Sequence, residues 1–267
     1  MIAKLKPILL ITLGALVVAA SGCNVINTLR AKNSLNEGVH DFNKGSFEDA
    51  EKKFERALEL SPDLPNARLF HARAINARFD QALTEDLGMQ TIKAYDDLMN
   101  RNKDNLEAVD QSLAFQAAVY DKLTGLDPTK AQEYKQKQRE TLLRRAELAS
   151  ASVQTKADVY YTIGVGYWKE SYELNYQYAK ANQTIPSDVL ERMKPHVQRA
   201  HEYLQKAISV KPDYANAWFY ESLVYIEDAK TEQQDAAKRK QLLAHVDEYR
   251  AKYIKMQKEQ AEQTPSK

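Results

Sequence analysis

The sequence predicts an all-α protein made of about five helical hairpins and closed by a long C-terminal capping helix. Glycine and proline number only 8 each among 267 residues, which leaves few turn residues and favours helices. Apolar residues also recur at three- and four-residue steps through most of the chain, the spacing that places them on one face of a helix.

The composition argues against several classes of function. A single cysteine excludes an internal disulfide and any zinc site built from cysteine pairs. Lys and Arg total 38 and Asp and Glu total 37, so the chain lacks the basic excess that is typical of nucleic-acid binding. We therefore expect no nucleic-acid partner.

The N-terminus has the layout of a secretory signal peptide. Two lysines precede an uncharged apolar run from Ile8 to Ala20, and two small residues then lead to Cys23. A transmembrane helix is the alternative, although the run is shorter than the roughly 20 apolar residues that a span needs. We expect a signal peptide at 1–22 and a membrane-proximal spacer at 23–31.

The segment Ala20-Ser21-Gly22-Cys23 resembles the lipobox of bacterial lipoproteins. The resemblance implies cleavage before Cys23, a lipid on its sulfur and acylation of the new amino terminus. Two or more acyl chains anchor a protein stably, so the expected location is the cell envelope, at the outer membrane or periplasmic face if the organism is Gram-negative. An ordinary signal peptide that happens to contain a cysteine is the alternative.

The clearest periodic stretch is "GVHDFNKGSFEDAEKKFERALELSPD", from Gly38 to Asp63. It predicts a helical hairpin whose second helix is capped by Ser46 and ended by Pro62. It is similar to the tetratricopeptide repeat (TPR), which implies a right-handed superhelical solenoid. The matching positions are Gly38, Gly45, Ala50, Phe54, Ala57 and Pro62. Small residues let the helices approach, and phenylalanines fill the gaps beside them.

The C-terminal half repeats the signature in "ADVYYTIGVGYW" and "RAHEYLQKAISVKPD". The segment inserted between these two stretches, from Glu170 to about Met193, should lengthen both arms of this hairpin. The best TPR matches are 31–64 and 157–230, within a helical domain at 32–258 that precedes a disordered tail at 259–267. The last helix, about 232–258, should cap the stack; a coiled-coil partner helix is the alternative.

The middle of the chain predicts helices without clear repeat motifs. Their expected ranges are 66–80, 85–100, 106–123 and 128–151. Asp127 should cap the last of these helices, and Pro128 should occupy its first helical position.

A catalytic constellation is not recognisable in the sequence. None of the five histidines lies in an H-E-x-x-H frame, and Gly164-Val165-Gly166 lacks the strand and third glycine of a nucleotide loop. We expect no enzyme activity, no cofactor and no metal ligand. A buried pair of ionisable groups in one cleft would favour an enzyme instead.

The resemblance also predicts where a partner binds, because the inner surface of TPR proteins comes mainly from the first helix of each hairpin. Register with the family assigns this groove to Phe42, Arg73, Tyr161, Trp168 and Phe219. Tyr and Trp are enriched among the residues that dominate binding energy. Burial of the rings at 160–178 as core is the alternative.

Two functions fit these features. The first is a lipid-anchored scaffold of the cell envelope that binds a protein or peptide partner in its groove. The second is a small-molecule-binding component associated with a solute uptake transporter. A closed cavity lined by Tyr161, Trp168 and Tyr172 would favour the second, and an open trough would favour the first.

Overall fold

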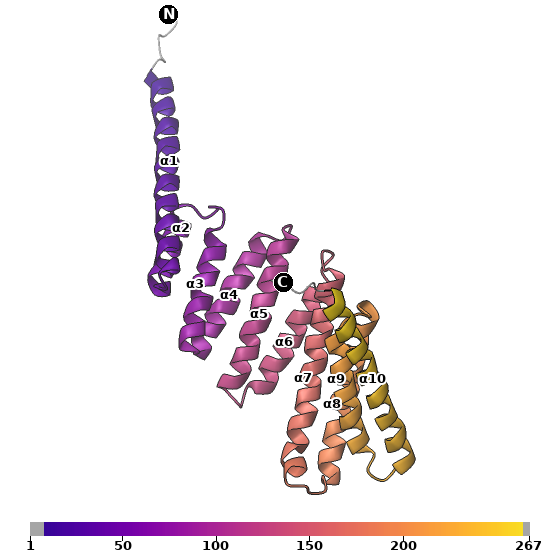
Figure 1. The fold of residues 1–267 in the computed structure, drawn as a ribbon. Coiled ribbons are helices and arrows are strands. Elements are labelled where there is room, and N and C mark those ends of the chain that lie inside the picture. The colour runs from indigo at the N-terminus through magenta and orange to yellow at the C-terminus, as the bar shows by residue number, and fades with distance from the viewer. Residues whose placement is uncertain (1–7, 264–267) are drawn as a thin grey trace, which may run out of the picture. The chain divides into compact units, whose positions relative to one another are not determined.

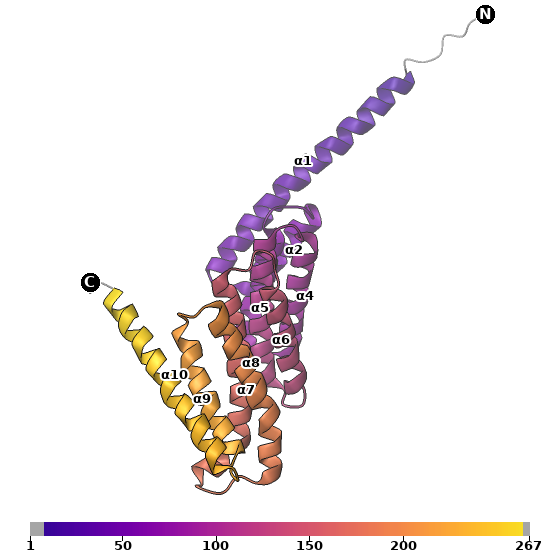
Figure 2. The ribbon, with the colours of Figure 1, turned by 90° about the vertical axis from the view of Figure 1, so that its right-hand side faces the viewer.

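A computed structural model describes the backbone of residues 8–263 and the side chains of residues 25–262 (Figures 1 and 2). Over this range the chain forms ten helices and no strand, in agreement with the predicted all-α class. The helices are α1 (Ile8–Asn43), α2 (Phe47–Leu60), α3 (Ala67–Ala82), α4 (Glu85–Arg101), α5 (Leu106–Leu126), α6 (Ala131–Ala146), α7 (Val153–Lys180), α8 (Ser187–Val210), α9 (Ala215–Thr231) and α10 (Ala236–Gln263).

The chain divides into two compact units, and the boundary falls inside α6 between Gln138 and Arg139. In the first unit α1 pairs with α2 and α3 pairs with α4; in the second, α7 pairs with α8 and α9 pairs with α10. These four pairs are hairpins of consecutive helices, of the about five that the sequence predicts.

The first hairpin is held by close packing of small and aromatic residues. Ala50, Phe54 and Ala57 are fully buried along α2. A methyl group on Gly38 of α1 would lie 2.6 Å from the Phe54 ring, closer than carbon atoms can approach. The predicted close approach of these two helices is confirmed, since only glycine leaves room for the ring.

The turn of this hairpin contains a glycine that the backbone requires. Gly45 has φ +80°, a left-handed conformation that costs glycine little and other residues more. Ser46 occupies the N-cap position of α2, but its side chain accepts no capping hydrogen bond. The predicted position is therefore confirmed and the predicted capping bond is wrong.

The predicted start of α6 is also wrong. The helix begins at Ala131, not at Pro128, because Asp127 holds a separate turn. Its carboxylate accepts hydrogen bonds from the backbone N–H of Thr129 at 2.8 Å and from the Thr129 hydroxyl at 2.7 Å. An Asp can satisfy a nearby backbone donor in a turn as readily as at a helix start, and here the turn is formed.

The second unit contains the lengthened hairpin that the insertion predicts. The added ends of α7 and α8 have a core of their own around fully buried Met193. Nearer the other end, Gly164 of α7 faces Leu204 of α8, whose Cγ would lie 2.7 Å from an added methyl group. The long hairpin thus repeats the glycine-mediated approach of the first.

Both ends of the described chain are more helical than the sequence suggests. α1 is continuous from Ile8 through the predicted spacer, and Ala31 is already fully buried. α10 starts at Ala236, after a turn, and runs to Gln263 into the segment expected as a disordered tail. Residues 259–263 are all Glu, Gln or Ala, which are good helix formers. Among the described residues, no helix is both long and apolar enough to span a bilayer.

Candidate partner-binding surface

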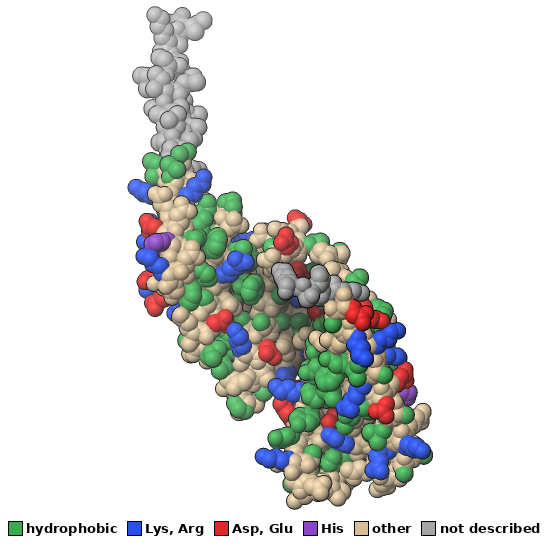
Figure 3. Space-filling view, in the orientation of Figure 1, with side chains coloured by type: hydrophobic (Ala, Val, Ile, Leu, Met, Phe, Trp, Pro, Cys, Tyr) green, Lys and Arg blue, Asp and Glu red, His purple; other side chains and the backbone are tan. Residues whose placement is uncertain are grey.

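Aromatic side chains of α7 and α9 form a continuous row in the second unit. The ring centroids are 5.5 Å apart for Tyr161–Tyr220, 5.2 Å for Tyr220–Trp168, 5.4 Å for Trp168–Tyr172 and 5.5 Å for Tyr172–Tyr176. Figure 3 shows apolar and aromatic side chains gathered on the visible face of this unit, in the region of α7, α9 and α10. We call these five residues the α7–α9 aromatic row.

Helical spacing explains why α7 contributes most of this row. Its members Tyr161, Trp168, Tyr172 and Tyr176 recur at steps of seven, four and four positions, so they share one face of the helix. Tyr220 comes from α9, which contacts α7. One helix face and its neighbour therefore create a strip of rings.

The row is neither sealed core nor fully exposed surface. Tyr161, Trp168 and Tyr220 pack against buried Val197, Ala200, Leu204 and Val224, yet each keeps an exposed part, and Tyr176 is 47% exposed. The rings touch one another, so the space between them is filled. This arrangement resembles a surface more than the enclosed pocket that Tyr161, Trp168 and Tyr172 would line in a solute-binding site.

The polar atoms of the row differ in their surroundings. The indole nitrogen Nε1 of Trp168 is buried and has no hydrogen-bond partner among the described residues. Burial, together with neighbouring Tyr220, raises the pKa of Tyr161 to about 12, so its hydroxyl stays protonated and can donate. Aromatic residues with a polar handle suit interfaces that are apolar on one side and wet on the other.

The predicted groove residues fall into two groups. Tyr161 and Trp168 belong to the row, and Phe219 joins it through Tyr220, with ring centroids 5.6 Å apart. Phe42 and Arg73 belong to the first unit, where both are half-buried. The Phe42 ring lies 5.1 Å from the Phe47 ring and packs beside Phe54. The structure therefore brings three of the five residues together, and the side chain of Cys23 lies outside the described residues.

Buried ion pairs lie in the same unit as the aromatic row, and sequence reasoning missed them. Glu170 of α7 is only 6% exposed; Arg139 of α6 lies 2.7 Å and His196 of α8 3.1 Å from its Oε2. The Arg139 guanidinium also stacks over the Tyr167 ring at 3.8 Å. The three partners come from three different helices and lie far apart in sequence, so no local motif could reveal them.

A second buried network joins α8 to α9. Glu221 is fully buried, and its Oε1 lies 2.7 Å from Nδ1 of His201. Nε2 of His201 lies 3.6 Å from Asp228. Burial lowers the pKa of His201, but its interactions with Asp228 and Glu221 outweigh this and raise the pKa to about 9. His201 is therefore a cation at neutral pH that partly neutralises buried Glu221.

The comparisons with known proteins bear on the fold. No family model and no curated protein matches the sequence. Among solved structures, the chain is similar to the "crystal structure of MamA protein", at 17% identity and a TM-score of 0.51, over 89% of this chain and 97% of that one.

Two further solved structures have lower scores. A second MamA crystal structure is 19% identical with a TM-score of 0.47, over 84% of this chain and 96% of that one. A tetratricopeptide repeat protein from Parabacteroides merdae is 14% identical with a TM-score of 0.28, over 82% of this chain and 99% of that one.

The chain has a TPR-like fold. The assignment depends on the first likeness and on the helical hairpins with their buried Gly, Ala and Phe positions. In TPR-like terms α7 and α9 are the first helices of their hairpins. The groove predicted from the sequence shares Tyr161 and Trp168 with the aromatic row.

Proposed function

We propose that this protein is a scaffold of the cell envelope, anchored by lipid on Cys23, that binds a protein or peptide partner on the α7–α9 aromatic row. The observation that carries the proposal is the row itself: five half-buried or exposed rings in mutual contact on adjacent helices. Helical repeat proteins use extended surfaces of this kind for binding, and large rings bury much area at low entropy cost.

The proposal is for binding and not for catalysis. Glu170 and Glu221 are buried ionisable groups, but each faces a cationic partner of the same unit. Such pairs account for the burial of the charges through packing between helices. Packing between helices does not account for the aromatic row in the same way, because its rings remain partly exposed to water.

Site-specific photocrosslinking in intact cells tests the binding surface. A benzophenone amino acid replaces Tyr176, which is 47% exposed in the row, or Leu243, which is 44% exposed on α10 and serves as the matched control. We expect a defined adduct from position 176 that is absent from position 243. Trp168→Ala should reduce this adduct while Trp218→Ala, outside the row, should not. Equal adducts from both positions would contradict the proposal.

Labelling with a palmitate analogue tests the anchor separately. The wild-type protein should incorporate the label and sediment with membranes, whereas Cys23→Ser should do neither. A Cys23→Ser protein that still sediments with membranes would show that an uncleaved apolar segment holds it.

Solute binding is the second candidate function, and it is supported by a cleft in the first unit. The loops after α2 and α4 line a cleft of about 520 Å³ in the first unit, a size that suits a small ligand. Its charged lining residues are Asp63, Arg68, Arg101 and Glu107. This role predicts that Arg101→Ala abolishes solute binding and that the Tyr176 adduct is absent.

A further inference from the structure

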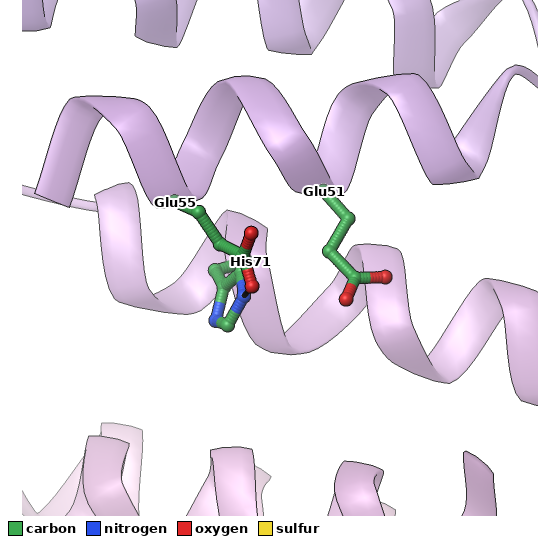
Figure 4. A group of neighbouring side chains, drawn as sticks. All are labelled: Glu51, Glu55 and His71. Atoms are coloured by element: carbon green, nitrogen blue, oxygen red, sulfur yellow. Dashed lines mark ion pairs between the residues drawn. The ribbon is translucent and has the colours of Figure 1, made fainter. Parts of the chain in front are cut away.

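The first unit brings together three side chains of the types that bind transition metals. Glu51 and Glu55 are one turn apart on α2, and His71 faces them from α3, as Figure 4 shows. One ligand atom from each residue can be chosen so that all three lie within 4.8 Å of one another. Helix α2 fixes the spacing of the two carboxylates, and contact between α2 and α3 places the imidazole beside them.

The cluster places two carboxylates close to a single guanidinium. Glu51 is 9% exposed and pairs with Arg78 of α3, whose Nη1 lies 2.5 Å from its Oε2. Glu55 adds a second carboxylate on the same face of α2, where like charges four residues apart repel. One guanidinium thus stands beside two carboxylates at this place.

One nitrogen of the His71 imidazole has no hydrogen-bond partner among the described residues. This atom, Nε2, is buried. The carboxylate of Glu55 is 3.5 Å away, beyond ordinary hydrogen-bond length. Most buried polar atoms have a partner, so this nitrogen and the two adjacent carboxylates are separate features that favour a cation at one place.

We propose that Glu51, Glu55 and His71 bind one divalent transition-metal ion of the zinc class. One imidazole nitrogen and two carboxylate oxygens form a common zinc ligand set, with a fourth position left for water. Ligand atoms around tetrahedral zinc lie about 3.3 Å apart. The exposed Glu55 side chain can close the gap by rotating, while Glu51 keeps one oxygen for Arg78 and offers the other.

This site departs from the sequence analysis, which predicts no metal ligand. The two glutamates stand at i and i+4 on one helix, and the histidine lies on the next helix along the chain. No short metal motif has this arrangement, because the third ligand depends on how α3 packs against α2. The cluster also lies outside the aromatic row, so the inference is independent of the proposed function.

Zinc titration of the full chain tests the site by calorimetry, in a Cys23→Ser background so that the thiol does not bind metal. We expect one equivalent of Zn²⁺ to bind saturably. Glu55→Gln should weaken binding at least tenfold without loss of helicity, since Glu55 is exposed. His71→Gln should do the same. Glu48→Gln and His40→Gln, which alter exposed residues of the same hairpin, are the matched controls and should bind as the parent does.

Arg78 gives the sharper test, because it competes with the metal for Glu51. Arg78→Gln should tighten zinc binding, whereas a purely structural cluster would gain no affinity. Absence of saturable binding, or equal affinity in Glu55→Gln and the parent, would overturn the inference. Replacing zinc by Co²⁺ should give a visible absorption band that His71→Gln removes.

Discussion

The first hairpin (α1–α2) and the long hairpin (α7–α8) are stabilised in different ways. Phe54 in the first lies against Gly38 with alanines on either side. The long hairpin keeps one such glycine contact but adds stacked rings and buried Glu170, which lies beside His196 of α8 and Arg139 of the preceding helix α6. The two hairpins share one repeat geometry, but the ion pair that joins the helices of the first, Lys53 with Glu37, is exposed, whereas the carboxylate paired in the second is buried.

The largest expected effect is the loss of the ring that fills the first hairpin. Phe54→Ala should lower the free energy of unfolding by about 3–5 kcal/mol, since it leaves a cavity beside Gly38. Phe47→Ala, on the same helix but half-buried, should cost clearly less. Chemical denaturation of both variants checks this, and equal losses would mean that Phe54 is not the central packing residue.

The contact between α8 and α9 should depend on pH through His201. Its pKa rises from 6.5 in the unfolded chain to about 9 in the fold, so its stabilising charge is complete below pH 6.5 and is lost as the pH rises through 9. The free energy of unfolding should fall by up to about 3 kcal/mol over this window. Denaturation between pH 6 and pH 9.5 measures it. His201→Gln should flatten the fall, and an unchanged slope in this variant would contradict the assignment.

Two glycines of α7 give a matched pair of smaller effects. A methyl group on Gly164 would lie 3.0 Å from the Leu204 backbone nitrogen, while Gly166 has open space. Gly164→Ala should therefore cost about 2 kcal/mol. Gly166→Ala should gain about 0.5–1 kcal/mol from helix propensity. Melting temperatures that move in the same direction would show that the helices do not meet at Gly164.

The smallest expected effect compares two serines at helix starts. The Ser152 hydroxyl oxygen accepts a hydrogen bond from the Thr155 N–H at 2.9 Å, whereas Ser46 makes no such bond. Ser152→Ala should cost about 1 kcal/mol, and Ser46→Ala should be close to neutral. Thermal melts resolve the difference, and a larger loss for Ser46→Ala would reverse the interpretation of both caps.

The fold could be predicted because its signals are local. Gly45, Pro62 and the apolar spacing of Phe54 mark a helical hairpin within one short stretch of sequence, and the structure confirms it. Local signals were weaker at turns: Asp127 can cap a helix or close a turn, and the sequence does not decide between them. Most differences between the predicted and the observed helices therefore lie at the helix boundaries.

The candidate sites were predictable only in part. Tyr161 and Trp168 share a helix face by spacing alone, so their proximity followed from the sequence. The pairing of His201 with Glu221, and of His71 with Glu55, depends on which helix faces which, and side-chain spacing along one helix cannot supply that. In the sequence, glutamates that alternate with lysines and arginines indicate a solvent-exposed helix face. Only the neighbouring helix shows which of them are buried.

The continuity of α1 limits how the protein can stand on a membrane. Ala31 is buried only about two helical turns after Cys23, which is about 12 Å along a helix. With lipid on Cys23, a short and continuous stretch of helix α1 would connect the first hairpin to the lipid headgroups. The first hairpin would then stay close to the bilayer surface.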